Sequence, residues 1–129
     1  MTIIVPNVGE VAMANKILNQ NMTLKLYGND VIPDESTTAV SLNEIVGGGY
    51  AAKTLNYANW VISSEGICIY PGQNFIFTGV ISAPGSVYGY YIIDADGILN
   101  WVERFPTSVL PFVPVADTLI RITPRIRVS

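Results

Sequence analysis

Turn residues cut the chain from residue 50 onward into short apolar segments, and this spacing limits the fold more than any other feature of the sequence. No segment of helical length separates them, so the crossovers that parallel strands need are missing and antiparallel pairing is expected. The pattern predicts a mainly β domain, either an antiparallel β-sandwich of jelly-roll-like form or a barrel. The candidate strands are residues 50–56, 59–63, 66–70, 74–81, 86–93 and 98–105.

The C-terminal segment has the clearest strand pattern, because apolar and polar residues alternate from residue 120. A shift of one residue would bury three arginines, so the pairing register is strongly determined. Pro124 has no amide hydrogen for a neighbouring strand, which predicts an edge strand or a bulge. One face carries Ile120, Ile122, Pro124, Ile126 and Val128, and the other carries Arg121, Thr123, Arg125, Arg127 and Ser129.

Only the N-terminal part of the chain has helical periodicity, and we predict one short helix over residues 8–19. Asn7 is the candidate N-cap, Glu10 falls in the first turn and Lys16 in the last, where each charge favours the helix dipole. The apolar residues at helical spacing are Val8, Val11, Ala12 and Leu18.

A half-buried strand follows the helix, because Met22, Leu24 and Leu26 alternate with polar residues. The 129 residues are expected to form one domain. Its parts would be an N-terminal arm and helix over residues 1–21 and a β-sandwich over residues 22–129.

Residues 31–49 contain Pro33, several Asp, Ser and Thr residues and three consecutive glycines, which predicts a long loop. Ser41 and Glu44 have the spacing of a capping box, so one helical turn is expected at residues 41–45.

Charge is scarce in this chain. Half of the residues are apolar and 13% are charged, whereas soluble domains carry roughly 25% charged residues. Either neutral polar side chains cover a monomer, or part of the surface is buried against other subunits. We expect the second, a homo-oligomer or an assembly component. The net charge of −3 argues against nucleic acid as a partner.

No segment approaches the ~20 apolar residues that span a bilayer, so no membrane partner is expected. Residues 1–5 are mostly apolar, but no basic residue precedes them and Pro6 interrupts the segment. They are not expected to act as a signal peptide, and the protein is expected to stay in the cell that makes it until something releases it.

The sequence contains no histidine, which removes the Ser-His-Asp and Cys-His arrangements of nucleophilic catalysis. Cys68 is the single cysteine, so no intrachain disulfide or cysteine-based metal site can form. In its predicted strand it is expected to be a small buried side chain. We therefore expect neither an enzyme nor a bound cofactor.

Three motifs resemble functional sites but are better explained by local structure. Residues 94–97 (DADG) start like a calcium loop, yet position 12 of that loop is Phe105 in place of glutamate, and Asp-Gly favours a hairpin turn. The glycine run 47–49 lacks the lysine of a P-loop and predicts a turn. Asp34 and Glu35 are adjacent acids in a polar loop and are expected to be solvated. No metal site is expected.

Two features could bind a partner. Tyr88 and Tyr90 are expected on one face of a strand, Tyr91 on the other, and Trp101 in the next strand of a hairpin. Exposed aromatic residues at this density would stack on sugars or fill a protein interface. The alternative, which we favour, is that they pack in the core.

The second feature is the arginine face of the C-terminal segment. Arg121, Arg125 and Arg127 are three of only seven basic residues in an acidic protein. They are either solvated or contact carboxylates of a neighbouring subunit.

The order of short motifs along the chain resembles a group of small structural proteins of tailed phages, common in phages of cyanobacteria and other aquatic bacteria. The resemblance covers nearly the whole chain and consists of structural rather than catalytic residues. Its motifs are Val5–Glu10, Leu24–Tyr27, Asn29-Asp30, Pro33, Gly49–Ala51, Lys53–Leu55, Trp60, Phe77–Gly79, Val87–Tyr91, Trp101–Phe105 and Ile122–Pro124.

This resemblance implies a protein made in the host cytoplasm that becomes part of the virion. It points further to a capsid decoration (cement) protein, which binds the major capsid protein between capsomers on the capsid surface. We expect a trimer or a dimer, since such proteins match capsid symmetry. The apolar arm residues Ile3, Ile4 and Val5, together with the arginine face, are the expected subunit interface.

Two other functions compete with this one. A tail-fibre or receptor-binding module would grip host-surface glycans through Tyr88, Tyr90 and Trp101. A small two-carboxylate glycosidase is disfavoured, because no pair of acids has a recognisable setting.

Overall fold

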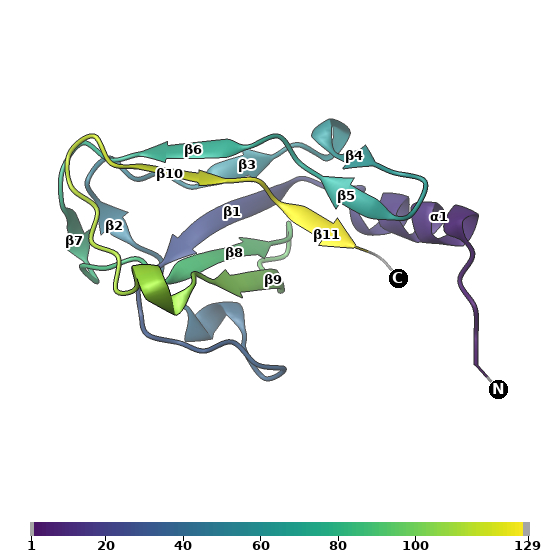
Figure 1. The fold of residues 1–129 in the computed structure, drawn as a ribbon, viewed down its shortest axis with the longest axis horizontal. Helices are drawn as coiled ribbons and strands as arrows, with labels where there is room; N and C mark the ends of the chain where they lie inside the picture. The colour runs from purple at the N-terminus through teal and green to yellow at the C-terminus, as the bar shows by residue number, and fades with distance from the viewer. Residues whose placement is uncertain (1, 128–129) are drawn as a thin grey trace.

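A four-stranded antiparallel sheet, in the order β3-β1-β8-β9, lies at the centre of the computed structural model, which describes residues 2–127 (Figure 1). A second layer, formed by β4, β5, β6, β10 and β11, packs against it through the large apolar cluster, and β4, β5, β6 and β10 lie above β8 and β9 in the view (Figure 1). The chain is mainly β and sandwich-like, with one N-terminal helix, which confirms the predicted fold class. The central strands are β1 (Met22–Tyr27), β3 (Lys53–Leu55), β8 (Gly89–Ile93) and β9 (Leu99–Arg104).

The remaining strands form three small antiparallel sheets, β10-β6, β11-β5-β4 and β2-β7. Each of the six segments predicted from residue 50 onward contains a strand, although most strands are shorter than predicted. The bounds are β2 (Val46–Gly47), β4 (Val61–Ile62), β5 (Ile67–Ile69), β6 (Gln73–Ile76), β7 (Ile81–Ala83), β10 (Leu119–Ile122) and β11 (Arg125–Arg127), with single 3-10 turns at Ala39–Ser41, Tyr57–Asn59 and Thr107–Val109.

The strand β1 is buried on its inner face, and Tyr27 at its end is buried on the other face as well. Met22, Leu24 and Leu26 point into a large apolar cluster between the two layers, as the period-two pattern predicts. Tyr27 points the other way and forms a smaller cluster with Leu42 and Tyr91. The long loop that follows β1 supplies Leu42, so this loop covers one end of the outer face of the sheet.

The C-terminal segment keeps its predicted faces but divides at Pro124 into two strands. Ile122 and Pro124 are buried and the three arginines are exposed, whereas Val128 and Ser129 lie outside the described residues. The prediction of one continuous strand is wrong: β10 pairs with β6, and β11 pairs with β5. Pro124 cannot donate at the break, and its carbonyl accepts from the Tyr70 amide (2.9 Å). β11 is an edge strand, as predicted.

The predicted strand over residues 74–81 also divides, because β6 ends at Ile76 and β7 begins at Ile81 in a different sheet. The glycine run beside it turns as predicted: residues 47, 48 and 49 have φ values of 89°, 63° and 80°. These left-handed conformations suit glycine. They let the Gly48 carbonyl accept from the Thr78 amide (2.8 Å), which ties the run to the end of β6.

The predicted helical turn at residues 41–45 is wrong in position. The 3-10 turn of the long loop lies at Ala39–Ser41. Thr38 and Ser41 form its capping box. Glu44 does not cap a helix, because its carboxylate binds Lys25 (3.4 Å) and the Tyr50 hydroxyl (2.7 Å).

The helix α1 (Asn7–Ile17) begins one residue earlier and ends two residues earlier than predicted. Pro6, not Asn7, occupies the N-cap position, and no side chain caps the helix. The placement of Glu10 in the first turn and Lys16 in the last is confirmed. Ala14 is the buried residue of this helix, so α1 packs against the sheets through a narrow contact.

Gly89 provides a test of how closely the central strands approach. A Cβ at this position would collide with the Glu103 carbonyl oxygen and the Tyr27 ring. Gly89→Ala should therefore lower the free energy of unfolding by about 3 kcal/mol, as overpacking does. Urea denaturation measures the change. Gly79→Ala is the matched control, because a Cβ there meets no atom within 4 Å. Equal stability of the two variants would contradict the close approach.

Candidate interaction site

The N-terminal arm, residues 2–5, is mostly apolar and has no regular secondary structure. Ile3 and Ile4 are 86% and 84% exposed, and Val5 is 37% exposed. The arm extends away from the two layers below α1 (Figure 1). Isoleucine side chains with such large exposed fractions are unfavourable in water unless a partner covers them. The structure therefore leaves this part of the predicted interface accessible.

The three arginines of the predicted interface are exposed on the outer side of the second layer. Arg121 donates to the Asn74 side-chain oxygen (3.1 Å) and packs against Gly72. Within residues 2–127 the ion pairs are Lys25–Glu44 and Arg104–Asp30, so neither Arg125 nor Arg127 has an ion-pair partner there. No carboxylate of the described residues neutralises these two guanidinium groups, so they can bind anions.

Exposed apolar pairs lie on the same outer side, and sequence reasoning missed them. Ile76 pairs with Leu119 across β6 and β10, and both side chains are more than half exposed. Val61 faces Ile69 across β4 and β5, and Ile69 in turn faces Arg125. The sequence does contain one sign of these pairs. Ile76 lies between two apolar residues, at a position where the alternation of a half-buried strand would place a polar residue. Apolar side chains interleaved with arginine are typical of protein interfaces.

A groove of about 250 Å³ separates β11 from the β8–β9 hairpin. It brings together two features that the sequence treats separately, the aromatic residues Tyr90 and Trp101 and the arginines Arg125 and Arg127. Trp101 is half-buried and lies against Trp60, with ring centroids 6.4 Å apart and planes inclined by 55°. The other lining residues are Ile92, Val102, Glu103, Pro124 and Ile126.

Tyr88 does not join this aromatic group, so the prediction that it shares a face with Tyr90 is wrong. Tyr90 packs against the large cluster, whereas Tyr88 packs against the small cluster that contains Tyr91. The alternation shifts at Gly89, the first residue of β8. Tyr88 instead lies under the Arg104 guanidinium, 5.2 Å from its Cζ atom to the ring centroid.

Glu103 is the acidic group of the groove. It lies directly across from Tyr90 in the β8–β9 register. Burial raises the pKa of Tyr90 to about 12, and the nearby Glu103 carboxylate contributes to the same shift. The Tyr90 hydroxyl is therefore a neutral donor beside a carboxylate at ordinary pH, which makes this side of the groove unfavourable for anions.

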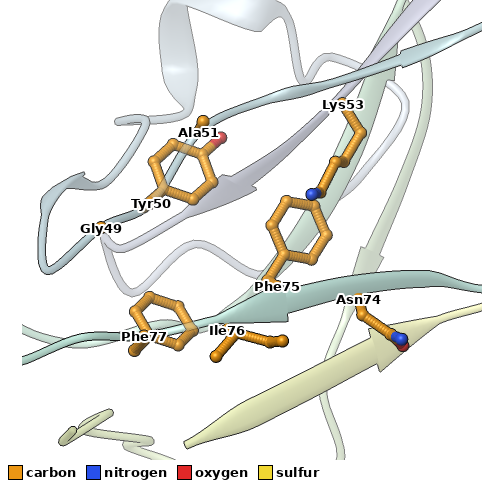
Figure 2. A pocket seen from close by; sticks show the side chains of 8 residues that line it. All are labelled: Gly49, Tyr50, Ala51, Lys53, Asn74, Phe75, Ile76 and Phe77. Atoms are coloured by element: carbon orange, nitrogen blue, oxygen red, sulfur yellow. The ribbon is translucent and has the colours of Figure 1, made fainter. Parts of the chain in front are cut away.

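A second hollow, of about 170 Å³, lies beside Tyr50 and Phe75 (Figure 2). The two rings stack at 5.8 Å, and Figure 2 shows the Lys53 side chain reaching over Phe75, with its Nζ 5.5 Å from the ring centroid. The Tyr50 hydroxyl donates to Glu44 and accepts from the Leu26 amide (3.2 Å). These bonds fasten the end of the long loop to β1, so they give Tyr50 a structural role.

The motifs with a local explanation have the predicted structures. Cys68 is buried, and burial raises the pKa of its thiol. The Asp94 carboxylate accepts hydrogen bonds from the Asn100 side chain (3.1 Å) and from the Ile98 and Asp96 amides. These bonds hold a turn and lower the pKa of Asp94.

In the part of the chain that the structure describes, no three or more His, Cys, Asp or Glu residues lie close enough to hold a metal ion. No helix among residues 2–127 is long and apolar enough to cross a membrane.

Comparison with known proteins identifies no relative: no family model, curated protein or solved structure matches the chain.

The buried tyrosines predict how stability depends on pH. Burial raises the pKa values of Tyr50, Tyr90 and Tyr91 above 10, the last two to about 12. A phenol whose pKa is higher in the folded state stabilises the protein fully below pH ~10, and this contribution is lost as the pH rises towards 12. The free energy of unfolding should therefore fall steeply above pH ~10. Urea denaturation between pH 8 and pH 11 measures the slope.

Tyr50→Phe separates this effect from general alkaline unfolding. The variant should lose about 1–2 kcal/mol at pH 8, because the bonds to Glu44 and Leu26 are gone. Its decline above pH ~10 should be shallower than that of the parent protein, since one raised pKa is removed. Parallel slopes would show that Tyr50 does not contribute.

Proposed function

We propose that this protein is a structural component of a phage virion, a capsid decoration (cement) protein that binds the major capsid protein between capsomers. The exposed apolar arm is the observation that carries the proposal, because Ile3 and Ile4 have no cover within the described chain. Full burial of one such side chain stabilises a complex by about 1.5–3 kcal/mol. An arm that is apolar but not packed is suited to insertion into a partner.

The helix behind the arm supports the same role. It has 11 residues, and isolated helices shorter than ~12–15 residues are marginal in water. Val8, Met13 and Ile17 are exposed, so much of its apolar surface also lacks cover. Arm and helix together would gain stability against a capsid surface, and the rigid β layers would hold them in place.

The groove supports a second candidate, a tail-fibre or receptor-binding module that recognises host-surface glycans. Trp101 and Tyr90 could stack on a sugar ring, and Glu103 with the arginines could bind its hydroxyl or acidic groups. Selective binding on a glycan array would favour this function over the first.

Capsids that lack the protein provide the test of the first candidate. Purified protein should bind them and raise the temperature at which they release DNA. A double substitution, Ile3→Ser with Ile4→Ser, should weaken binding by at least about 100-fold, because two buried side chains are lost. Circular dichroism should be unchanged.

The matched control is Val40→Ser with Ile98→Ser. Both residues are exposed and apolar, but they line a hollow between the long loop and the β8–β9 turn. This variant should bind capsids as the parent does. Capsid binding that survives loss of both arm isoleucines would remove the arm from the contact, and failure of the parent protein to bind would reject the cement function.

A further inference from the structure

Two free sheet edges border the groove. Among residues 2–127, β9 pairs only with β8, and β11 pairs only with β5. Each therefore has a row of backbone amide and carbonyl groups that no strand occupies. Such edges bind extended polypeptide by adding it as a further strand.

The inner side of the groove is apolar and well anchored. Ile92 is buried, and Tyr90, Trp101 and Ile126 all pack against the large apolar cluster. Trp101 is braced by Trp60, which itself meets Tyr70 edge-on at 5.2 Å. An apolar side chain that entered here would extend the core of the sandwich at its open side.

The outer rim has the opposite character, because Arg125 and Arg127 project from alternate positions of β11. Ile126, between them, faces inward. A strand added beside β11 would place its own residues on the same two faces, since cross-strand neighbours share a face. Its outward residues would meet the arginines and its inward residues would meet Ile126 and Trp101.

We infer that the groove binds an extended segment of a partner protein in which acidic and apolar residues alternate. The segment pairs with the free edge of β11, its carboxylates bind Arg125 and Arg127, and an apolar side chain contacts Trp101. The arm of a second copy does not fit this description, because residues 2–5 contain no carboxylate. Glu103 on the far rim repels carboxylates and so sets which side of the groove they take.

This inference rests on the proposed function only in taking a protein as the partner. An acidic saccharide would also use the arginines and Trp101, but it would leave the free backbone edge of β11 unused. The structure therefore favours a polypeptide, and the saccharide is one outcome of the test.

The probe is a synthetic peptide, acetyl-Asp-Val-Glu-Val-Asp-Val-amide, titrated into ¹⁵N-labelled protein. NMR shifts should appear at the Trp101 indole N–H and at the amides of Arg125 and Arg127. A lysine version of the peptide should produce none. Arg125→Gln with Arg127→Gln should weaken binding by about 10-fold, because two charge-assisted contacts are removed.

Arg121→Gln is the matched control, since Arg121 is on the same segment but bonds Asn74 outside the groove. It should leave the affinity unchanged. Absence of shifts in the groove, or equal binding by the double variant, would overturn the inference. Tighter binding of an oligoglucuronate than of the peptide would reassign the groove to acidic saccharides.

Capsid binding by the same double variant separates this inference from the proposed function. If the parent protein and the double variant bind capsids equally, the groove is not the contact, although the cement function stands. If the parent protein does not bind capsids, the cement function fails, and the peptide titration still decides the groove.

Discussion

The burial of β1, complete on its inner face and extended to the other face by Tyr27, is the constraint on which the rest of the structure depends. Leu24 and Leu26 join the large cluster between the layers, and Tyr27 joins the small cluster on the other side. β1 also pairs with two strands, β3 and β8. A single short strand thus positions the central sheet, the second layer above it and the long loop that covers its other face.

Polar bonds around β1 extend this constraint to the loops. Glu44 joins Lys25 of β1 to the Tyr50 hydroxyl, and the same hydroxyl binds the Leu26 amide. Because these groups are partly shielded from solvent, their hydrogen bonds help to define one arrangement of the chain around β1. The fold is therefore well determined near β1, while the arm, α1 and the outer side of the second layer have little support from the described chain.

The weak support of the arm, α1 and the outer side of the second layer explains why the surface of the protein resembles a protein–protein interface. The chain carries few charges and exposes many apolar residues, among them those on the arm, on α1 and across β4–β5 and β6–β10. The free edges of β9 and β11 would also invite nonspecific pairing. Glu103, Arg125 and Arg127 border these edges, and charged side chains at an edge discourage pairing with a neutral strand. Arg125 and Arg127 still allow pairing with a strand that carries complementary carboxylates.

The sequence by itself determined which segments are extended and, in β1 and the C-terminal segment, which residues face inward. It also determined that the first segment is helical and that Cys68 is buried. These are local properties, since they follow from the period of the side chains along one strand or helix. Only the tertiary structure decided which strands pair, where Pro124 splits the C-terminal segment, and that Tyr88 and Tyr90 belong to different clusters. It alone placed Trp101 and Arg125 on the walls of one groove. Such neighbours meet through pairing between distant parts of the chain and through close approaches such as that at Gly89, which no local pattern encodes.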